Sequence, residues 1–457
     1  MSPSWAGRGR PLLWALVLVV GSLVAAAGQG QPGTVWAWSG AVTSTSAVVK
    51  AKVRGAFKDL NLLYDIDRRM QGARRVPTGE SARADAAGVV TFTLDGLTPD
   101  TRFYYTVADG DRRTLTGELR TFKEGAYSFD FATASCAGGN MLSAVSNSTI
   151  FTNIEIRRPL FFLHTGDFHY SNISRNDLRL FQRAYDAVLT QPRQASLYRH
   201  VPIVYVWDDH DFGPNDSDRT SPARDAARAA YTQAVPHYPL TLDGGRVTTI
   251  QQEFTVGRVR FIVSDLRSER DPAGQPDGPG KSMLGARQRE WLDAAFARAA
   301  AERWPLVVWV STVPWITRTG SKEDGWEPYA SERRWLADRL EGLGLTHRLL
   351  LVAGDAHMLA IDDGTNSNYV STAKPGTPGF PVLQASPLDR SPTIKGGPYS
   401  HGVSAESGQY AWVQVQDDGA ELRITVTGHD RGGRQVPGMR LQMTCAEDGC
   451  AVVREAS

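Results

Sequence analysis

The sequence predicts an α/β domain with a largely central sheet, preceded by a small all-β domain. Two observations lead to this prediction. From residue 128 onward, apolar segments of strand type alternate with amphipathic segments of helix type, which indicates a sheet flanked by helices. Between about residues 35 and 122, short alternating strands follow one another with turn residues between them. That second pattern is typical of an antiparallel sandwich.

Composition supports a globular protein and argues against one class of partner. The 457 residues are 41% hydrophobic and 22% charged, which suits a chain of about two or three domains with a sizeable core. The formal net charge is +1, and no long basic run occurs. We therefore expect no specific binding to nucleic acid. The sequence does not indicate an oligomeric state.

Residues 1–27 have the pattern of a secretory signal peptide. Arg8 and Arg10 precede an apolar run that ends in three alanines. A membrane anchor is the alternative, but Gly21 and Ser22 interrupt the run. We expect a secreted or periplasmic protein that keeps no stable membrane span after the signal is removed.

Residues 33–123 are expected to form the all-β domain. The segment LDGLTPDTRFYYTV within it resembles the corner between two strands of a fibronectin type III domain. We predict strands at 35–42, 46–53, 61–66, 88–97, 102–110 and 115–122.

Residues 128–435 are expected to form the α/β domain. Its predicted strands cover 128–136, 159–167, 201–209, 259–267, 305–315 and 347–357, with 411–418 and 420–430 completing the sheet. Its predicted helices cover 176–191, 223–235, 285–304 and 330–343.

The three cysteines divide into a close pair and a single residue. In an exported chain, Cys445 and Cys450 indicate a small disulfide loop within a C-terminal tail, residues 436–457. Cys136 is left unpaired, and it is either buried and inert or held by a metal.

Metal-capable side chains follow four of the predicted strands at their carboxyl ends. A single Asp at such a position is more often a turn or helix cap than a ligand. When such residues recur after several separate strands, they indicate a binding site, because α/β sheets bind ligands at the carboxyl ends of their strands. In chain order these residues are Cys136, then Asp167 and Tyr170, then Asp209, His210 and Asn215, and finally Asp355 and His357.

Three of these motifs together resemble the alkaline phosphatase D (PhoD-like) family of metallophosphoesterases. They are GD-x-x-Y at 166–170, WDDHD at 207–211 and GD-x-H at 354–357. The resemblance implies a metallophosphatase-type sandwich of β-sheets flanked by helices. It also implies Fe³⁺ held by Cys136, Asp167, Tyr170 and His357, and Ca²⁺ held by Asp167, Asp209, Asp355 and Asn215.

The chemistry of the side chains agrees with this division of metals. Tyr and Cys bind metals only when deprotonated, and a highly charged ferric ion favours such anionic ligands. Oxygen ligands suit calcium. Relatives that use zinc or manganese supply a further His after the strand that corresponds to 305–315. Here Ser311 and Thr312 occupy that region, which favours calcium.

The expected activity is hydrolysis of phosphate esters or diesters by a metal-activated hydroxide. His210 is expected to act as general acid or electrostatic stabiliser, or else to orient Asp209. Arg267 is expected to clamp phosphoryl oxygens, with a structural ion pair to Asp265 as the alternative. Two other functions stay open, a phospholipase D-type diesterase and a cell-surface binding module whose metal site is only structural.

Overall fold

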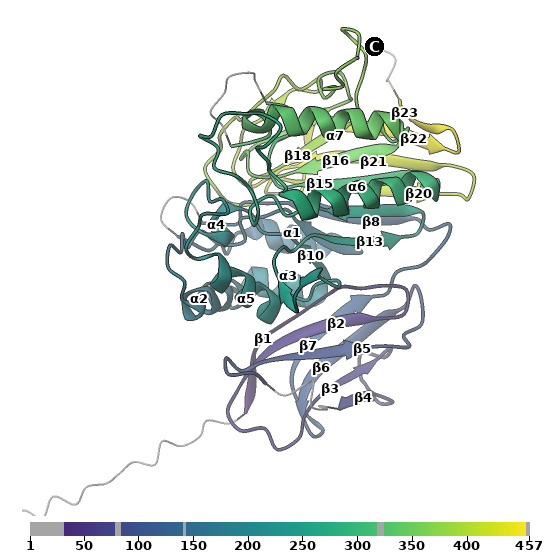
Figure 1. Ribbon diagram of the computed structural model, residues 1–457. Helices are drawn as coiled ribbons and strands as arrows, with labels where there is room; N and C mark the ends of the chain where they lie inside the picture. The colour runs from purple at the N-terminus through teal and green to yellow at the C-terminus, as the bar shows by residue number, and fades with distance from the viewer. Residues whose placement is uncertain (1–31, 78–83, 140–142, 318–323, 454–457) are drawn as a thin grey trace, which may run out of the picture.

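The computed structural model describes residues 32–77, 84–139, 143–317 and 324–453, and Figure 1 shows them as two sheets between helices with a β-domain beneath. The predicted signal peptide at 1–27 lies outside the described residues. No helix in the described ranges has the length and apolarity that a bilayer span requires.

The first large sheet has ten strands in the order β23-β22-β21-β20-β8-β9-β10-β1-β2-β5. Its central strands β8, β9 and β10 run parallel, so their carboxyl ends share one edge. The strands of the α/β part are β8 (Phe129–Ala134), β9 (Phe161–His164), β10 (Ile203–Tyr205), β20 (Tyr410–Asp417), β21 (Leu422–His429), β22 (Gln435–Ala446) and β23 (Gly449–Val452).

The second large sheet has seven strands in the order β13-β14-β15-β16-β18-β17-β19. Strands β14, β15, β16 and β18 are parallel. The strands are β13 (Gln252–Val256), β14 (Val259–Val263), β15 (Leu306–Ser311), β16 (Leu349–Ala353), β17 (Leu359–Asp362), β18 (Val382–Ala385) and β19 (Val403–Ser404). A separate two-stranded ribbon consists of β11 (Leu242–Asp243) and β12 (Arg246–Val247).

Helices cover the outer faces of the two sheets. Figure 1 shows α6 and α7 on one side and α2, α3 and α5 on the other. The helices are α1 (Thr149–Arg157), α2 (Leu178–Leu189), α3 (Pro192–His200), α4 (Asp209–Phe212), α5 (Arg224–Ala234), α6 (Ala286–Ala301) and α7 (Ala330–Gly342), with 3₁₀ turns η2 (Glu327–Tyr329) and η3 (Thr346–Arg348). The four predicted helices correspond to α2, α5, α6 and α7, whereas α1, α3 and the short α4 are additional.

Aromatic side chains fill the space between the two sheets. Phe131 of β8 and Phe161 of β9 each meet Phe261 of β14 edge to face, with ring centroids 5.5 Å apart. All three rings are fully buried. A second apolar cluster lies under the outer helices, where Phe296 of α6 packs on Trp309 of β15. This packing holds the two sheets face to face.

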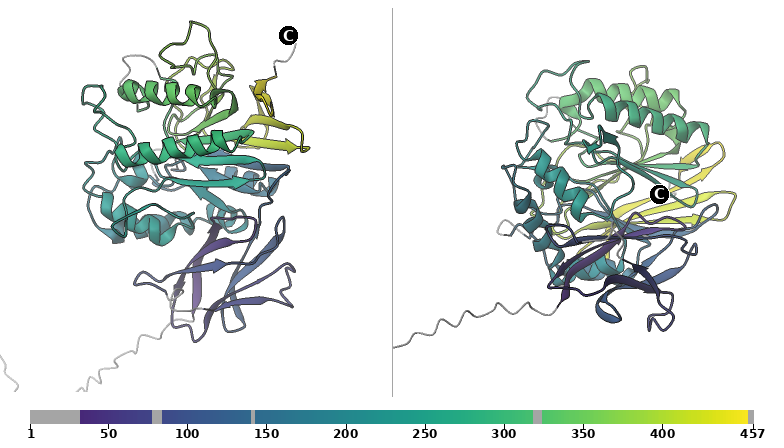
Figure 2. Two further views of the ribbon diagram at one scale, coloured as in Figure 1. Left: turned by 45° about the vertical axis from the view of Figure 1, so that its right-hand side comes forward. Right: turned by 60° about the horizontal axis from the view of Figure 1, so that its bottom comes forward.

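The N-terminal part is all-β, as the sequence predicts. Its seven strands are β1 (Gly33–Gly40), β2 (Ala47–Arg54), β3 (Leu60–Asp65), β4 (Arg74–Pro77), β5 (Val89–Leu94), β6 (Arg102–Asp109) and β7 (Arg112–Arg120). One layer has the order β1-β2-β5 and the other β4-β3-β6-β7. Figure 2 shows this domain against one end of the larger one.

The N-terminal domain also joins the larger domain directly. Gly40 of β1 pairs in parallel with Ile203 of β10, so the layer β1-β2-β5 extends the ten-stranded sheet. The Trp36 indole donates to Asp186 of α2 at 2.8 Å, and the Tyr105 hydroxyl donates to the Arg199 carbonyl of α3 at 3.0 Å.

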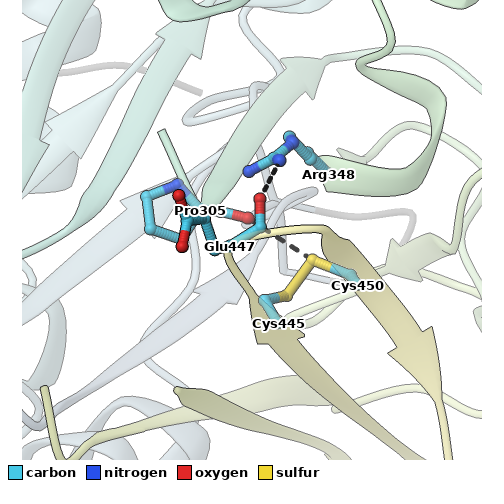
Figure 3. Close-up of a disulfide and its surroundings, with 5 residues drawn as sticks. All are labelled: Pro305, Arg348, Cys445, Glu447 and Cys450. Atoms are coloured by element: carbon cyan, nitrogen blue, oxygen red, sulfur yellow. Dashed lines mark hydrogen bonds between the residues drawn. A yellow bond between two sulfur atoms is a disulfide. The ribbon is translucent and has the colours of Figure 1, made fainter. Parts of the chain in front are cut away.

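The C-terminal segment ends in a disulfide-linked hairpin at the edge of the ten-stranded sheet (Figure 3). Cys445 of β22 and Cys450 of β23 form the predicted bridge, and Cys136 is free and buried. The carbonyl of Glu447 in the turn accepts a hydrogen bond from Arg348. The predicted boundary at residue 436 does not coincide with a break in the sheet, because β22 runs through it and pairs with β21.

Candidate metal centre

The predicted ligands lie at one edge of the molecule because parallel strands bring them there. Cys136 follows β8, Asp167 follows β9, Asp209 follows β10, and Asp355 follows β16 of the second sheet. Backbone hydrogen bonds join the first two of these loops: the Cys136 amide donates to the Gly166 carbonyl at 3.1 Å. The four predicted strand ends therefore converge on one site.

The backbone at these strand ends adopts a conformation that side chains other than glycine rarely take. Positive φ angles occur at Cys136 (62°), Asp167 (57°), Asp355 (63°) and His357 (51°). Such residues are concentrated at functional sites, where the surrounding structure holds them in place. Gly166 of the GD-x-x-Y motif has φ of 101°, and a Cβ there would lie 2.4 Å from the Cβ of Asp208.

One half of the site combines sulfur, phenol, carboxylate and imidazole. Ligand atoms of Cys136, Asp167 and His357 all lie within 4.8 Å of one another. The Tyr170 hydroxyl donates to Asp167 Oδ2 at 2.7 Å and lies 3.1 Å from His357 Nε2. His357 Nδ1 lies 3.0 Å from the Ser391 carbonyl, to which it donates, so Nε2 faces the site.

Burial sets the protonation of this half. It raises the pKa of the Cys136 thiol and of the Tyr170 phenol, and the neighbouring Asp167 raises both further. Burial also raises the pKa of Asp167, with added repulsion from Asp209. It lowers the pKa of His357 to about 4, with smaller contributions from Lys395 and Arg390. A bound cation would reverse these preferences for the thiol, phenol and carboxyl by stabilising their anions.

The other half consists of carboxylates. Ligand atoms of Asp208, Asp209 and Asp355 form one group within 4.8 Å, and those of Asp209, Asp216 and Asp324 form another. Asn215 and Asp216 are both exposed, and the Asp216 amide donates to Asp209 Oδ2 at 2.6 Å. The turn after α4 therefore places an additional carboxylate, which the sequence motifs did not single out, near the predicted calcium ligands.

His210 stands between the two halves. Its Nδ1 lies 2.5 Å from Asn172 Oδ1, an amide oxygen that can only accept, so Nδ1 carries the proton. Its ring centroid is 4.2 Å from that of Tyr170. Burial lowers the His210 pKa, against the opposing charge of Asp209. A ligand atom of His210 also groups with Asp167 and Asp209, so the ring can reach a metal or a leaving group.

The predicted role of Arg267 as a clamp for phosphoryl oxygens does not fit its position. The side chain is fully buried. Its Nε donates to Asp208 at 2.5 Å and one terminal nitrogen donates to Asp324 at 2.6 Å. Asp265, the predicted partner, accepts from the Arg267 backbone amide at 3.1 Å, and its carboxylate also accepts from the Trp207 indole at 2.8 Å. Arg267 therefore positions Asp208 and Asp324, since its donors face buried carboxylates and a backbone carbonyl and not solvent.

The residues present fit a cation at this site. Among the described residues, Asp167 Oδ1, Asp208 Oδ2 and Asp209 Oδ1 are buried and have no hydrogen-bond partner. Buried carboxylate oxygens need such a partner or a metal. Thr312, which directly follows β15, donates to the other Asp208 oxygen, Oδ1, at 3.0 Å. The donor set is thus one thiol, one phenol, one imidazole and several carboxylates.

Besides Asp216, sequence reasoning missed two more residues at the site. Asp324 comes from the segment between β15 and α7, which has no strand-end pattern. Lys395 comes from the loop after β18, and its Nζ lies 2.9 and 2.8 Å from the two Asp355 oxygens. Strand β18 has only four residues, too few for periodicity to mark the loop that follows it.

A separate groove of about 470 Å³ lies between the N-terminal domain and the opposite end of the central strands. Its lining mixes cations such as Arg102 and Arg158 with acids such as Glu118 and Asp130. It lies at the amino ends of β8 and β9, and none of the candidate ligands lines it, so the chemistry is assigned to the other edge.

Together, the two packed sheets and the ligand cluster at their shared edge define an α/β protein with a candidate multinuclear metal centre. The family model for PhoD-like phosphatases matches residues 131–421, well over half of the chain. The chain therefore belongs to the PhoD-like phosphatase family.

Individual relatives agree with this assignment. Alkaline phosphatase D of Bacillus subtilis (strain 168) is 21% identical over 323 residues, covering 61% of this chain and 54% of that protein. The chain thus spans about half the length of this curated relative. The solved structure of PhoD superposes with a TM-score of 0.68 at 16% identity, covering 93% of this chain and 92% of that one.

A purple acid phosphatase shares the fold as well. The structure of PPD1 from yellow lupin (Lupinus luteus) seeds gives a TM-score of 0.65 at 11% identity, covering 93% of this chain and 78% of that one. At such identities the likeness shows the shared fold, including the paired sheets on which the candidate ligands sit.

Proposed function

We propose that this protein is an exported phosphoesterase that depends on metal ions. The observation that supports it is the meeting of Cys136, Asp167, Tyr170 and His357 with the carboxylates of Asp209 and Asp355 at one edge of both sheets. The donor types favour Fe³⁺ in the first half and Ca²⁺ in the second. Membership of the PhoD-like phosphatase family supports phosphate esters as the substrates.

The side chains at the site have different roles in the proposed reaction. Bound cations would hold phosphoryl oxygens and make a nucleophile from water at moderate pH. Asp167, which lies within 4.8 Å of ligand atoms in both halves, is placed to join them. Asp208 and Arg267 hold the carboxylate half in place through their 2.5 Å ion pair.

His210 is the side chain that we assign to proton transfer. Because Nδ1 donates to Asn172, the protonated ring presents its second N–H at Nε2. Proton donation to the leaving oxygen is the step that poor leaving groups need most.

Export is supported by two features of the chain. The N-terminal segment has the signal pattern described above, and Cys445 and Cys450 form a disulfide, which persists in oxidising compartments. We also propose that residues 33–123 are a fibronectin type III-like domain, since their strand orders β1-β2-β5 and β4-β3-β6-β7 match a seven-stranded sandwich.

The test combines metal analysis with activity on an aryl phosphate monoester and an aryl phosphate diester. We expect tightly held iron, activity lost on chelation, and activity restored by calcium. Metal-stripped protein that kept full activity on both substrates would overturn the proposal. Protein that binds the metals but hydrolyses neither ester would instead favour a structural role for the site.

A further inference from the structure

The loop that follows β18 is fastened to the strand ends that carry the candidate ligands. The Asp389 amide donates to the Cys136 carbonyl at 3.2 Å, and the Thr393 amide donates to the His357 carbonyl at 3.1 Å. The Asp389 side chain accepts from Ser146 at 2.6 Å and pairs with Arg431 at 3.0 Å. These contacts fix a loop, residues 386–397, over the metal centre.

Two cations of this loop face the centre from different sides. The guanidinium carbon of Arg390 lies 4.0 Å from the centre of the Tyr170 ring. This packing depends on Gly138, where a Cβ would lie 2.4 Å from the Tyr170 ring and 2.9 Å from Arg390 Cδ. Lys395 reaches the other half, where its ammonium group contacts both oxygens of Asp355.

The ion pair of Lys395 differs from those of Arg267 and Arg270. Both arginines are fully buried and both bind Asp324, so that carboxylate already has two permanent cationic partners. The Lys395 side chain keeps 25% of its exposure, and its partner Asp355 is itself a candidate ligand. The Lys395 contact is therefore the one that a metal on Asp355 would replace.

Replacement of that contact leaves the ammonium group beside bound cations, which repel it. A flexible four-carbon stem lets the group move, and only an anion can bring it back to the centre. A phosphate group held by the cations supplies such an anion, with oxygens that accept charge-assisted hydrogen bonds. Lys395 can thus pair first with the Asp355 carboxylate, in the metal-free protein, and later with a phosphate group held by the metals.

We propose that Lys395 is a substrate-binding residue that leaves Asp355 when the metals bind and then contacts the non-bridging oxygens of the phosphate group. This inference rests on the proposed function and adds to it a residue of the chain that touches the substrate. It also makes a second claim: in the metal-free protein, Lys395 competes with calcium for Asp355.

The test uses the metal-loaded protein and inorganic phosphate as the probe, with binding followed by calorimetry. Lys395→Met keeps the stem and removes the charge, whereas Lys395→Arg keeps the charge. Lys374→Met is the control, because Lys374 is an exposed lysine of another loop. We expect Lys395→Met to weaken phosphate binding about tenfold or more, Lys395→Arg to restore most of it, and the control to bind as the wild type does.

Calcium titration of the metal-stripped proteins separates substrate binding from a structural role. Without a competing ammonium group, Lys395→Met should bind calcium at least as tightly as the wild type. Wild-type phosphate affinity in Lys395→Met, or loss of calcium from it, overturns the proposal. Because phosphate binding needs no turnover, absent ester hydrolysis in the wild type would count against the proposed function separately.

Discussion

Arg267 and Asp208 form a fully buried ion pair, with 2.5 Å between the guanidinium Nε and the carboxylate. The same guanidinium reaches Asp324, so one side chain joins the loop after β14 to two other segments. These charges raise the pKa of Arg267 despite its burial. The attraction within a buried pair is largely offset by the loss of hydration of both charges. Removing one partner is nevertheless costly, because the other charge then stays buried without a counter-ion.

Replacing Arg267 by Met should therefore destabilise the protein strongly. Two buried carboxylates would lose their shared counter-ion, which typically costs about 3 to 5 kcal/mol. Urea unfolding followed by circular dichroism measures the change. The control Arg434→Gln alters an ion pair whose arginine side chain is 86% exposed, and it should leave the unfolding midpoint unchanged. A stable Arg267 variant with only a raised KM would restore the phosphate-clamp role.

His164 should contribute to acid sensitivity. Its ring lies in β9 with both nitrogens buried and without a hydrogen-bond partner among the described residues, and burial lowers its pKa to about 3. The unfolded chain takes up this proton near pH 6.5, so stability falls as the pH drops from about 6.5 toward 3. From pH 7.5 to 5 the loss is about 2 kcal/mol.

His164→Leu should lessen this pH dependence, whatever its effect on stability at pH 7.5. The measurement is the unfolding free energy at both pH values, compared with an exposed control, His347→Gln. An unchanged pH dependence in His164→Leu would mean that the buried ring gains a proton partner as the pH falls.

The convergence of the candidate ligands was predictable because strand direction fixes where strands end. Once β8, β9 and β10 are parallel, residues just beyond them must meet, whatever the lengths of the connecting helices. The partners of Arg267 were not predictable in this way. Asp324 lies 57 residues further along the chain, in a segment whose path depends on loop packing.

Two features of the fold were hidden for a similar reason. The N-terminal layer joins the large sheet through the single pairing of Gly40 with Ile203, and no sequence pattern marks so short a contact. Strand β18 has only four residues between turn-rich loops, so the position of Lys395 after it could not be derived from periodicity. Longer strands carried enough alternation or apolar length to be recognised.

Asp209→Asn and His210→Ala should have different effects on metal content and rate. Asp209 offers a buried oxygen without a hydrogen-bond partner among the described residues. Asp209→Asn should therefore lower both the metal content and the rate of hydrolysis. Loss of His210 as a general acid should lower kcat about 10²-fold or more with metal content intact. The loss should shrink for esters with good leaving groups. Reduced metal content in His210→Ala would make the ring a ligand, which its grouping with Asp167 and Asp209 allows.

Tyr170→Phe should remove a visible absorption band. Burial and Asp167 raise the pKa of the Tyr170 phenol, so without a metal this side chain stays protonated and donates to Asp167 at 2.7 Å. Ferric iron bound by Cys136, Asp167 and His357 would replace that proton and convert the phenol to phenolate. Charge transfer from phenolate to iron then colours the protein, and the colour should require both Tyr170 and iron.

The phenylalanine variant keeps the ring that packs 4.2 Å from His210 and beneath Arg390, so the fold should be preserved. Visible spectra, iron content and far-UV circular dichroism of wild type and variant, each with and without added iron, give the comparison. We expect equal circular dichroism and a band that is strong only in iron-loaded wild type. A wild type that is colourless, free of iron and fully active would assign Tyr170 to hydrogen bonding with Asp167 alone, and the site to colourless metals.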